Sequence, residues 1–178
     1  MMTLTLLLAQ SLGGLPAQEP SVVPQLLNPG NVKKLVAAPG GLWAFERPRD
    51  AVDIGRDARA QTLSLGLPVG RRFCELRLTT VGLPTGNAAT LALSAAAKLK
   101  SLPQAQFQPT RKVSRSVLRQ GVRFNRLNNP SMGRFALQWF QVERGQAMIA
   151  HLEAPRQFEA ACAGRAEAIA LSMKRVGP

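Results

Sequence analysis

The chain has 178 residues, 46% of them hydrophobic and 19% charged, which is enough for one sizeable core and short for two. Its 23 Lys and Arg against 10 Asp and Glu give a formal net charge of +13, which favours nucleic acid, an anionic membrane surface or an acidic protein as partner. Two cysteines and one histidine exclude a Cys/His zinc site of the usual ligand count, and no apolar run reaches the roughly 18 residues of a membrane span.

Residues 1–40 are predicted to be an apolar and then Pro/Gly-rich N-terminal segment, either a signal peptide or a loosely attached arm. The Leu-rich run at 3–9 is typical of a signal-peptide core, and small residues up to Ala17 offer cleavage positions. The first basic residue is Lys33, however, so the positive region that precedes such a core is missing. This pattern slightly favours a cytoplasmic or nucleoid protein, and it indicates a periplasmic or secreted one if residues 1–17 are a signal peptide.

Residues 41–178 are predicted to form one α+β domain. Alternating apolar residues predict strands over 41–47, 61–67, 72–79, 134–142 and 147–153, besides a basic hairpin within 111–126. Helices are expected over 87–100, with Leu91, Ala95 and Leu99 in its buried stripe, and over 155–173. Because short turns join the later strands, we expect a single, largely antiparallel sheet in the order strand, helix, four-strand meander, helix, with the helices packed on it.

Three short motifs carry a resemblance to known proteins. They are GLWAFERP at 41–48, Gly121 within the hairpin, and ALSMK at 170–174 after the last helix. Together with the order of elements, they resemble the PsbP/Mog1-like families of photosystem accessory proteins, Ran-binding proteins and secreted bacterial domains, over residues 35–176. The resemblance implies an α+β fold and a binding role, and it brings no catalytic residues.

The basic stretch at 111–126 is the main candidate site. No Asp or Glu occurs from Leu76 to Val142, a span that holds ten Lys and Arg residues. At the two-residue period of a strand, Arg115, Arg119 and Arg123 share one face. Because nothing in the span neutralises these cations, we predict a polyanion-binding face, and the alternative is an ordinary solvated face of the sheet.

The first functional hypothesis is a non-enzymatic protein that binds nucleic acid with little sequence preference, favours single-stranded DNA, and acts in stress response or DNA damage response. Bases would stack on an aromatic ring beside the arginines, and the sequence leaves open whether Trp139 or Phe140 faces them. The candidate binding residues are Arg111, Lys112, Arg115, Arg119, Arg123, Arg126, Arg134, Lys98, Lys100 and Trp139.

The second hypothesis is a secreted or periplasmic PsbP/Mog1-like accessory or ligand-binding module, whose basic face meets an acidic partner or an anionic envelope surface. Neither hypothesis includes an enzyme, a metal or a cofactor, because His151 has no acidic or cysteine cluster beside it in sequence and no serine stands in a nucleophile motif.

The two cysteines bear on the compartment. Cys74 lies on the inward face of a predicted strand, and Cys162 lies on the inward face of the final helix. We therefore expect them to be close together, with a disulfide only if the protein is exported.

Overall fold

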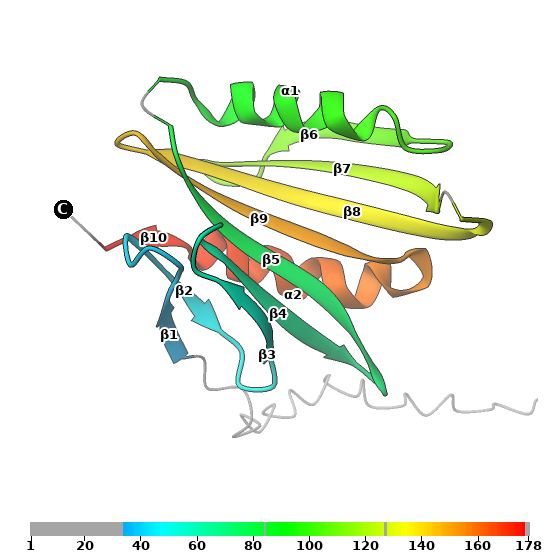
Figure 1. The fold of residues 1–178 in the computed structure, drawn as a ribbon, viewed down its shortest axis with the longest axis horizontal. Coiled ribbons are helices and arrows are strands. Elements are labelled where there is room, and N and C mark those ends of the chain that lie inside the picture. The colour runs from blue at the N-terminus through cyan, green and yellow to red at the C-terminus, as the bar shows by residue number, and fades with distance from the viewer. Residues whose placement is uncertain (1–33, 84, 127, 177–178) are drawn as a thin grey trace, which may run out of the picture.

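The computed structural model describes residues 34–83, 85–126 and 128–176 (Figure 1). The strands are β1 (Lys34–Ala37), β2 (Trp43–Arg47), β3 (Val52–Asp57), β4 (Thr62–Val69), β5 (Arg72–Gly82), β6 (Gln106–Lys112), β7 (Val117–Arg126), β8 (Asn129–Glu143), β9 (Gln146–Pro155) and β10 (Lys174–Arg175). The helices are α1 (Ala88–Leu99) and α2 (Glu159–Ser172), and the short 3₁₀ helix η2 (Arg156–Phe158) precedes α2. The signal-peptide region predicted over 1–17 lies outside the described residues.

The strands form two antiparallel sheets. The larger has seven strands in the order β3-β4-β5-β9-β8-β7-β6, and the smaller has three in the order β1-β2-β10. The predicted α+β class with antiparallel pairing is therefore confirmed. The prediction of a single sheet is wrong, because the four-strand meander β6 to β9 continues onto β5, β4 and β3, while β10 returns to pair with β2 and closes a second sheet.

The folded part begins before residue 41, where the sequence placed its start. β1 pairs with β2, with Val36 opposite Phe45. The Pro/Gly residues that suggested an arm make the turn between these strands, in which Gly40 and Gly41 have φ angles of 82° and 72°. Only glycine adopts such angles readily, so these residues close a hairpin instead of forming a linker.

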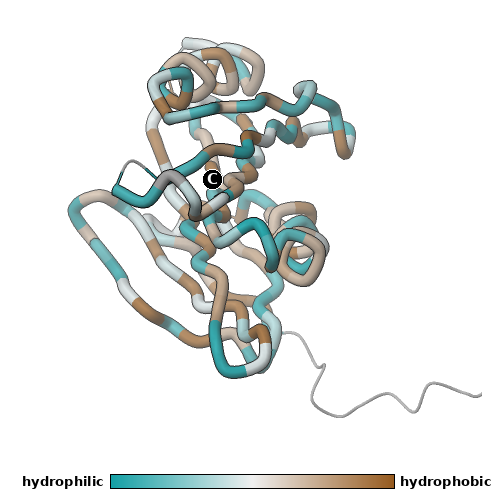
Figure 2. Tube along the Cα trace, turned by 90° about the vertical axis from the view of Figure 1, so that its right-hand side faces the viewer, coloured by the Kyte–Doolittle hydropathy of each residue, from teal (hydrophilic) through white to brown (hydrophobic). Residues whose placement is uncertain are grey.

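The two helices cover opposite faces of the larger sheet. Along β8, Leu137 and Trp139 point into the main core beneath α2, whereas Ala136 belongs to a smaller cluster packed against Leu99 of α1. Figure 2 shows the helices apart, α1 at the top and α2 at the side of the strands. Because both faces are covered in the middle of β8, neighbouring residues that point to opposite sides, such as Ala136 and Leu137, are both buried there.

The predicted inward residues of α2 are buried, whereas those of α1 are half-buried and its buried residue is Ala92. The α1 helix begins at Asn87, whose side-chain oxygen accepts hydrogen bonds from the backbone N–H groups of Ala89 and Thr90, and its Leu91 and Leu99 are half-buried. In α2, Cys162 and Ile169 are buried in the main core. No helix in the described ranges is long and apolar enough to span a membrane.

A disulfide joins Cys74 of β5 to Cys162 of α2, with their Cα atoms 6.4 Å apart. The structure thus brings together the two cysteines that the sequence placed on inward faces. Both residues are almost completely buried, so the bond fixes α2 to the middle of the larger sheet.

Candidate functional site

The predicted basic hairpin exists, but its arginines do not form one face. Arg119 and Arg123 share the α2 side of β7, as the two-residue period predicts. Arg115 lies exposed in the turn between β6 and β7, and Arg111 and Lys112 are exposed at the end of β6.

The basic span is also partly neutralised, which corrects the premise that nothing compensates its cations. Arg119 Nη1 lies 3.0 Å from Glu167 Oε2, and Arg123 Nε lies 2.9 Å from Glu159 Oε2, both on α2. Arg134 Nε lies 2.8 Å from Glu153 Oε1 on β9. Carboxylates beyond the acid-free span of sequence therefore fold back onto three of its arginines.

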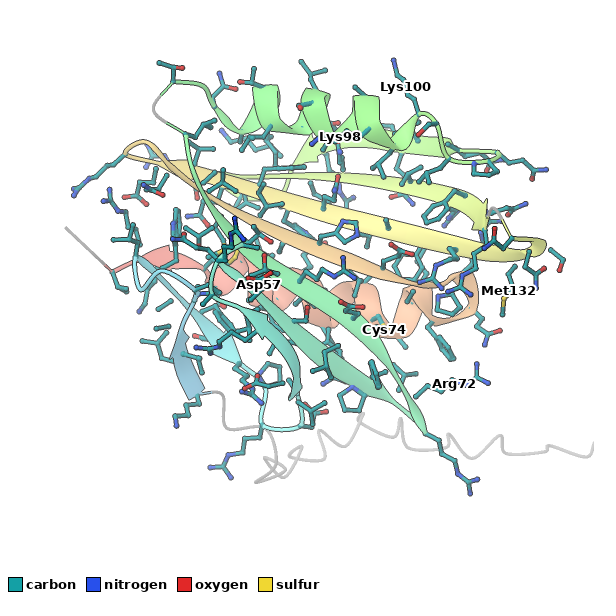
Figure 3. All side chains as sticks on the ribbon, in the orientation of Figure 1. Asp57, Arg72, Cys74, Lys98, Lys100 and Met132 are labelled. Atoms are coloured by element: carbon teal, nitrogen blue, oxygen red, sulfur yellow. A yellow bond between two sulfur atoms is a disulfide. The ribbon has the colours of Figure 1, made fainter. Side chains whose placement is uncertain are left out.

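The remaining members of the predicted site lie elsewhere. Lys98 and Lys100 lie at the end of α1, on the opposite side of the larger sheet from Arg119 and Arg123, and Figure 3 shows both beside α1. Trp139 is fully buried in the main core. The prediction that bases stack on Trp139 is therefore wrong. The alternation of residues along β8 shows which side chains share a face, but it does not show that α2 covers the face of Trp139.

A different polar group occupies the face of the larger sheet opposite α2. Figure 1 shows β4, β5 and β9 in front of α2, with no helix over them on the viewer's side. On this side of the sheet a row of directly opposed residues crosses five strands. Ser64 of β4, Arg77 of β5 and His151 of β9 lie on its open part, and Gln138 of β8 and Gln120 of β7 continue the row on the part that α1 covers.

The row contains a directional chain of hydrogen bonds. Gln120 Nε2 donates to Gln138 Oε1 over 2.7 Å, and Gln138 Nε2 donates to His151 Nδ1 over 3.1 Å. Because Nδ1 accepts this bond, the ring proton is on Nε2, which faces Glu153 Oε2 at 3.7 Å. The chain therefore fixes the orientation and tautomer of the histidine.

Two carboxylates lie opposite each other beside this row, Glu75 on β5 and Glu153 on β9. Interaction with His151 and then with Arg134 lowers the pKa of Glu153 to about 2. A hydrogen bond of 2.6 Å from Arg77 Nε is the main cause that lowers the pKa of Glu75. Both carboxylates are therefore ionised at neutral pH, and each is held by one arginine.

These side chains line a polar cleft of about 220 Å³, which we call the arginine cleft. Its lining residues are Glu75, Arg77, Arg126, Arg134, His151 and Glu153. Three arginines face two glutamates, and Arg126 forms no ion pair with any described acid. The described residues contain no group of three His, Cys, Asp or Glu that could hold a metal ion.

Comparisons with known proteins identify the fold. No family model matches the sequence, and no curated protein matches it. Solved structures do match. LpqN of Mycobacterium tuberculosis, described as involved in cell envelope biogenesis, has a TM-score of 0.57 and 12% identity over 82% of this chain and 91% of its own. Cyanobacterial PsbP (CyanoP) of Synechocystis has a TM-score of 0.54 and 11% identity over 81% of this chain and 92% of its own. The fold is PsbP/Mog1-like.

A third structure, from Bacteroides thetaiotaomicron, has a TM-score of 0.55 and 15% identity over 81% of this chain and 48% of that one. The present chain thus spans about half the length of the Bacteroides chain. The PsbP/Mog1-like resemblance that the sequence motifs suggested is confirmed at the level of fold.

Sequence reasoning missed the arginine cleft of this PsbP/Mog1-like domain. It treated His151 as isolated, because its neighbours Arg77 and Gln138 are contributed by other strands. A weak signal was present: Glu75 and Arg77 on β5, and His151 and Glu153 on β9, are each two residues apart and so share one side of their strand. Neither strand's sequence alone specifies the pairing register that brings these two pairs of residues together.

Proposed function

We propose that this chain is an exported, non-enzymatic accessory module that binds an acidic protein or an anionic envelope surface. The observation that carries the proposal is the buried disulfide between Cys74 and Cys162. Disulfides persist in oxidising compartments such as the periplasm and are rare in the cytosol. The apolar run at 3–9, with its signal-peptide character, agrees with export.

The likeness to CyanoP and LpqN supports an accessory role by analogy of fold. The anionic partner follows from charge. With a net charge of +13, the protein attracts polyanions over long range. Exposed cations that form no ion pair with a described acid provide the contacts, and they are Lys98, Lys100, Arg111, Lys112 and Arg115.

Export is tested on protein purified from its native host. We expect an intact mass that lacks about the first 13 to 18 residues, at a small-residue cleavage position. We also expect no reactive thiol under denaturing, non-reducing conditions. An unprocessed N-terminus together with two free thiols would refute export.

The partner class is tested by cosedimentation with vesicles. We expect binding to vesicles that contain phosphatidylglycerol and none to pure phosphatidylcholine vesicles, with release on raising the salt concentration because the attraction is electrostatic. The variant Lys112→Gln/Arg115→Gln should bind more weakly than the wild type. Equal binding to both vesicle types would contradict an electrostatic partner surface.

Nucleic-acid binding has less support than the sequence alone suggested. Arg119, Arg123 and Arg134 have carboxylate partners, and Trp139 is buried. Fluorescence anisotropy with a labelled 30-nucleotide single strand provides the comparison, and we expect weak binding at physiological salt. Tight, salt-dependent binding of the wild type would restore the nucleic-acid hypothesis.

A further inference from the structure

We propose that the open face of the larger sheet binds an amphiphilic anion, with its carboxylate or phosphate head group in the arginine cleft and its apolar body against Val52, Ile54 and Phe73. We call these three side chains the apolar patch. The site is separate from the exposed cations that the proposed function uses, and it does not depend on export of the protein.

The cleft has unused capacity for an anion. Arg77 and Arg134 each donate through Nε to one glutamate, and no described residue accepts a hydrogen bond from their terminal Nη groups. Arg126 adds a third guanidinium without an acidic partner among the described residues. Paired N–H donors of this kind match the two oxygens of a carboxylate or phosphate.

The surroundings strengthen this preference. Arg134 and His151 are only 18% and 23% exposed, so their charges and dipoles are poorly screened by water. The two glutamates hold Arg77 and Arg134 in place and leave one positive charge in excess. A bound monoanion would neutralise the cleft without breaking either existing ion pair.

The apolar patch lies on an exposed part of the sheet surface. Val52, Ile54 and Phe73 are 48%, 39% and 53% exposed. They converge over Gly66, where an added Cβ would lie 2.9 Å from a Val52 methyl carbon, 3.2 Å from an Ile54 methyl carbon and 3.4 Å from the Phe73 ring. The glycine therefore makes room for three apolar side chains to gather on a face that no helix covers.

The patch adjoins the cleft directly. Gly66 is paired with Glu75, which lines the cleft. Phe73 precedes Glu75 by two residues on β5, so both side chains point to the open face about 7 Å apart. A cleft of about 220 Å³ accepts a head group only, and the chain attached to that head group would lie across the patch.

The experiment is isothermal titration calorimetry of the full chain with dodecyl phosphate below its micelle concentration. We expect saturable binding with about one ligand per protein. Inorganic phosphate should bind at least about tenfold more weakly, because it leaves the patch exposed. Dodecyl maltoside, which lacks the anionic head, should show no saturable binding.

Two variants and two matched controls locate the site. Arg126→Gln and Phe73→Ser should each weaken dodecyl phosphate binding about tenfold, whereas Arg115→Gln and Leu171→Ser, exposed elsewhere, should not change it. All four positions are exposed, so the variants should keep the wild-type unfolding temperature, which circular dichroism checks.

Each other result overturns the proposal. If inorganic phosphate bound as tightly as dodecyl phosphate, the apolar patch would contribute nothing to binding. If dodecyl maltoside bound as tightly, the anionic head group would not be required. If both site variants kept the wild-type affinity, the ligand would bind elsewhere. Binding to phosphatidylglycerol vesicles without binding to dodecyl phosphate would also refute this site, and it would leave the proposed surface function standing.

Discussion

Replacing Glu159 and Glu167 with Gln removes the two carboxylates that neutralise Arg123 and Arg119. The side chains of Arg119 and Glu167 are 14% and 25% exposed, and those of Arg123 and Glu159 are 46% and 18% exposed. Ion pairs at such partly exposed sites contribute about 0.2–1 kcal/mol each. We expect the double variant to lose about 0.4–2 kcal/mol of stability, which lowers its Tm by about 1–8 °C.

The same change should expose the basic face that the sequence alone predicted. Each phosphate contact steepens the plot of log affinity against log salt by about 0.7 for a single strand, so two released arginines should steepen it by about 1.4. Fluorescence anisotropy with a labelled single-stranded oligonucleotide at several salt concentrations measures this slope.

Glu143→Gln is the matched control. Glu143 is exposed and forms no ion pair within the described ranges, so this variant raises the net charge by one without releasing an arginine. Its slope should stay at the wild-type value. If the double variant also kept the wild-type slope, Glu159 and Glu167 would not be the reason that the arginines of β7 do not bind polyanions.

Three further predictions concern stability. Reducing the disulfide between β5 and α2, whose cysteines are 88 residues apart, should lower the unfolding free energy by about 4–5 kcal/mol, measured by urea denaturation with and without reductant. Gly121→Ala should lower the free energy of unfolding by about 1–3 kcal/mol, because the new Cβ would lie 2.8 Å from a Leu137 methyl carbon. In the control Gly82→Ala the new Cβ meets nothing within 4 Å, so its stability should stay near that of the wild type. Equal melting curves for the two variants would refute the packing argument. The pKa of Glu153 is lowered from 4.5 to about 2, so its stabilisation is complete above pH 4.5 and is lost as the pH falls towards 2; the stability difference between the wild type and Glu153→Gln should shrink over that window, and a constant difference would contradict it.

The periodicity of apolar residues predicted the features that depend on a single helix or strand. The alternation along β7 and the inward faces of the helices follow from patterns within one element, and the proximity of the cysteines needed only the added expectation that the last helix packs on the sheet. β3 was missed because all six of its residues are exposed and its apolar alternation is limited to Val52 and Ile54. β1 was missed because it stands next to a Pro/Gly turn that was interpreted as a linker.

The site depended on information that no single element contains. The partners of Arg123 and Arg119 are 36 and 48 residues away, so an acid-free span of sequence did not make an acid-free surface. The arginine cleft requires the register between β5, β9 and β8, which is set by the whole meander. The burial of Trp139 required knowing that α2 covers its side of β8.

The two outer strands of the larger sheet limit how another chain can join it. The pairing of β3 shifts register between Asp53 and Gly55, and that of β6 shifts between Gln108 and Arg111, where Pro109 has no N–H to donate. An incoming extended peptide needs an unbroken row of backbone donors and acceptors along an outer strand. A register shift interrupts that row in both outer strands, which disfavours fibril growth at either margin and the addition of a partner's strand there.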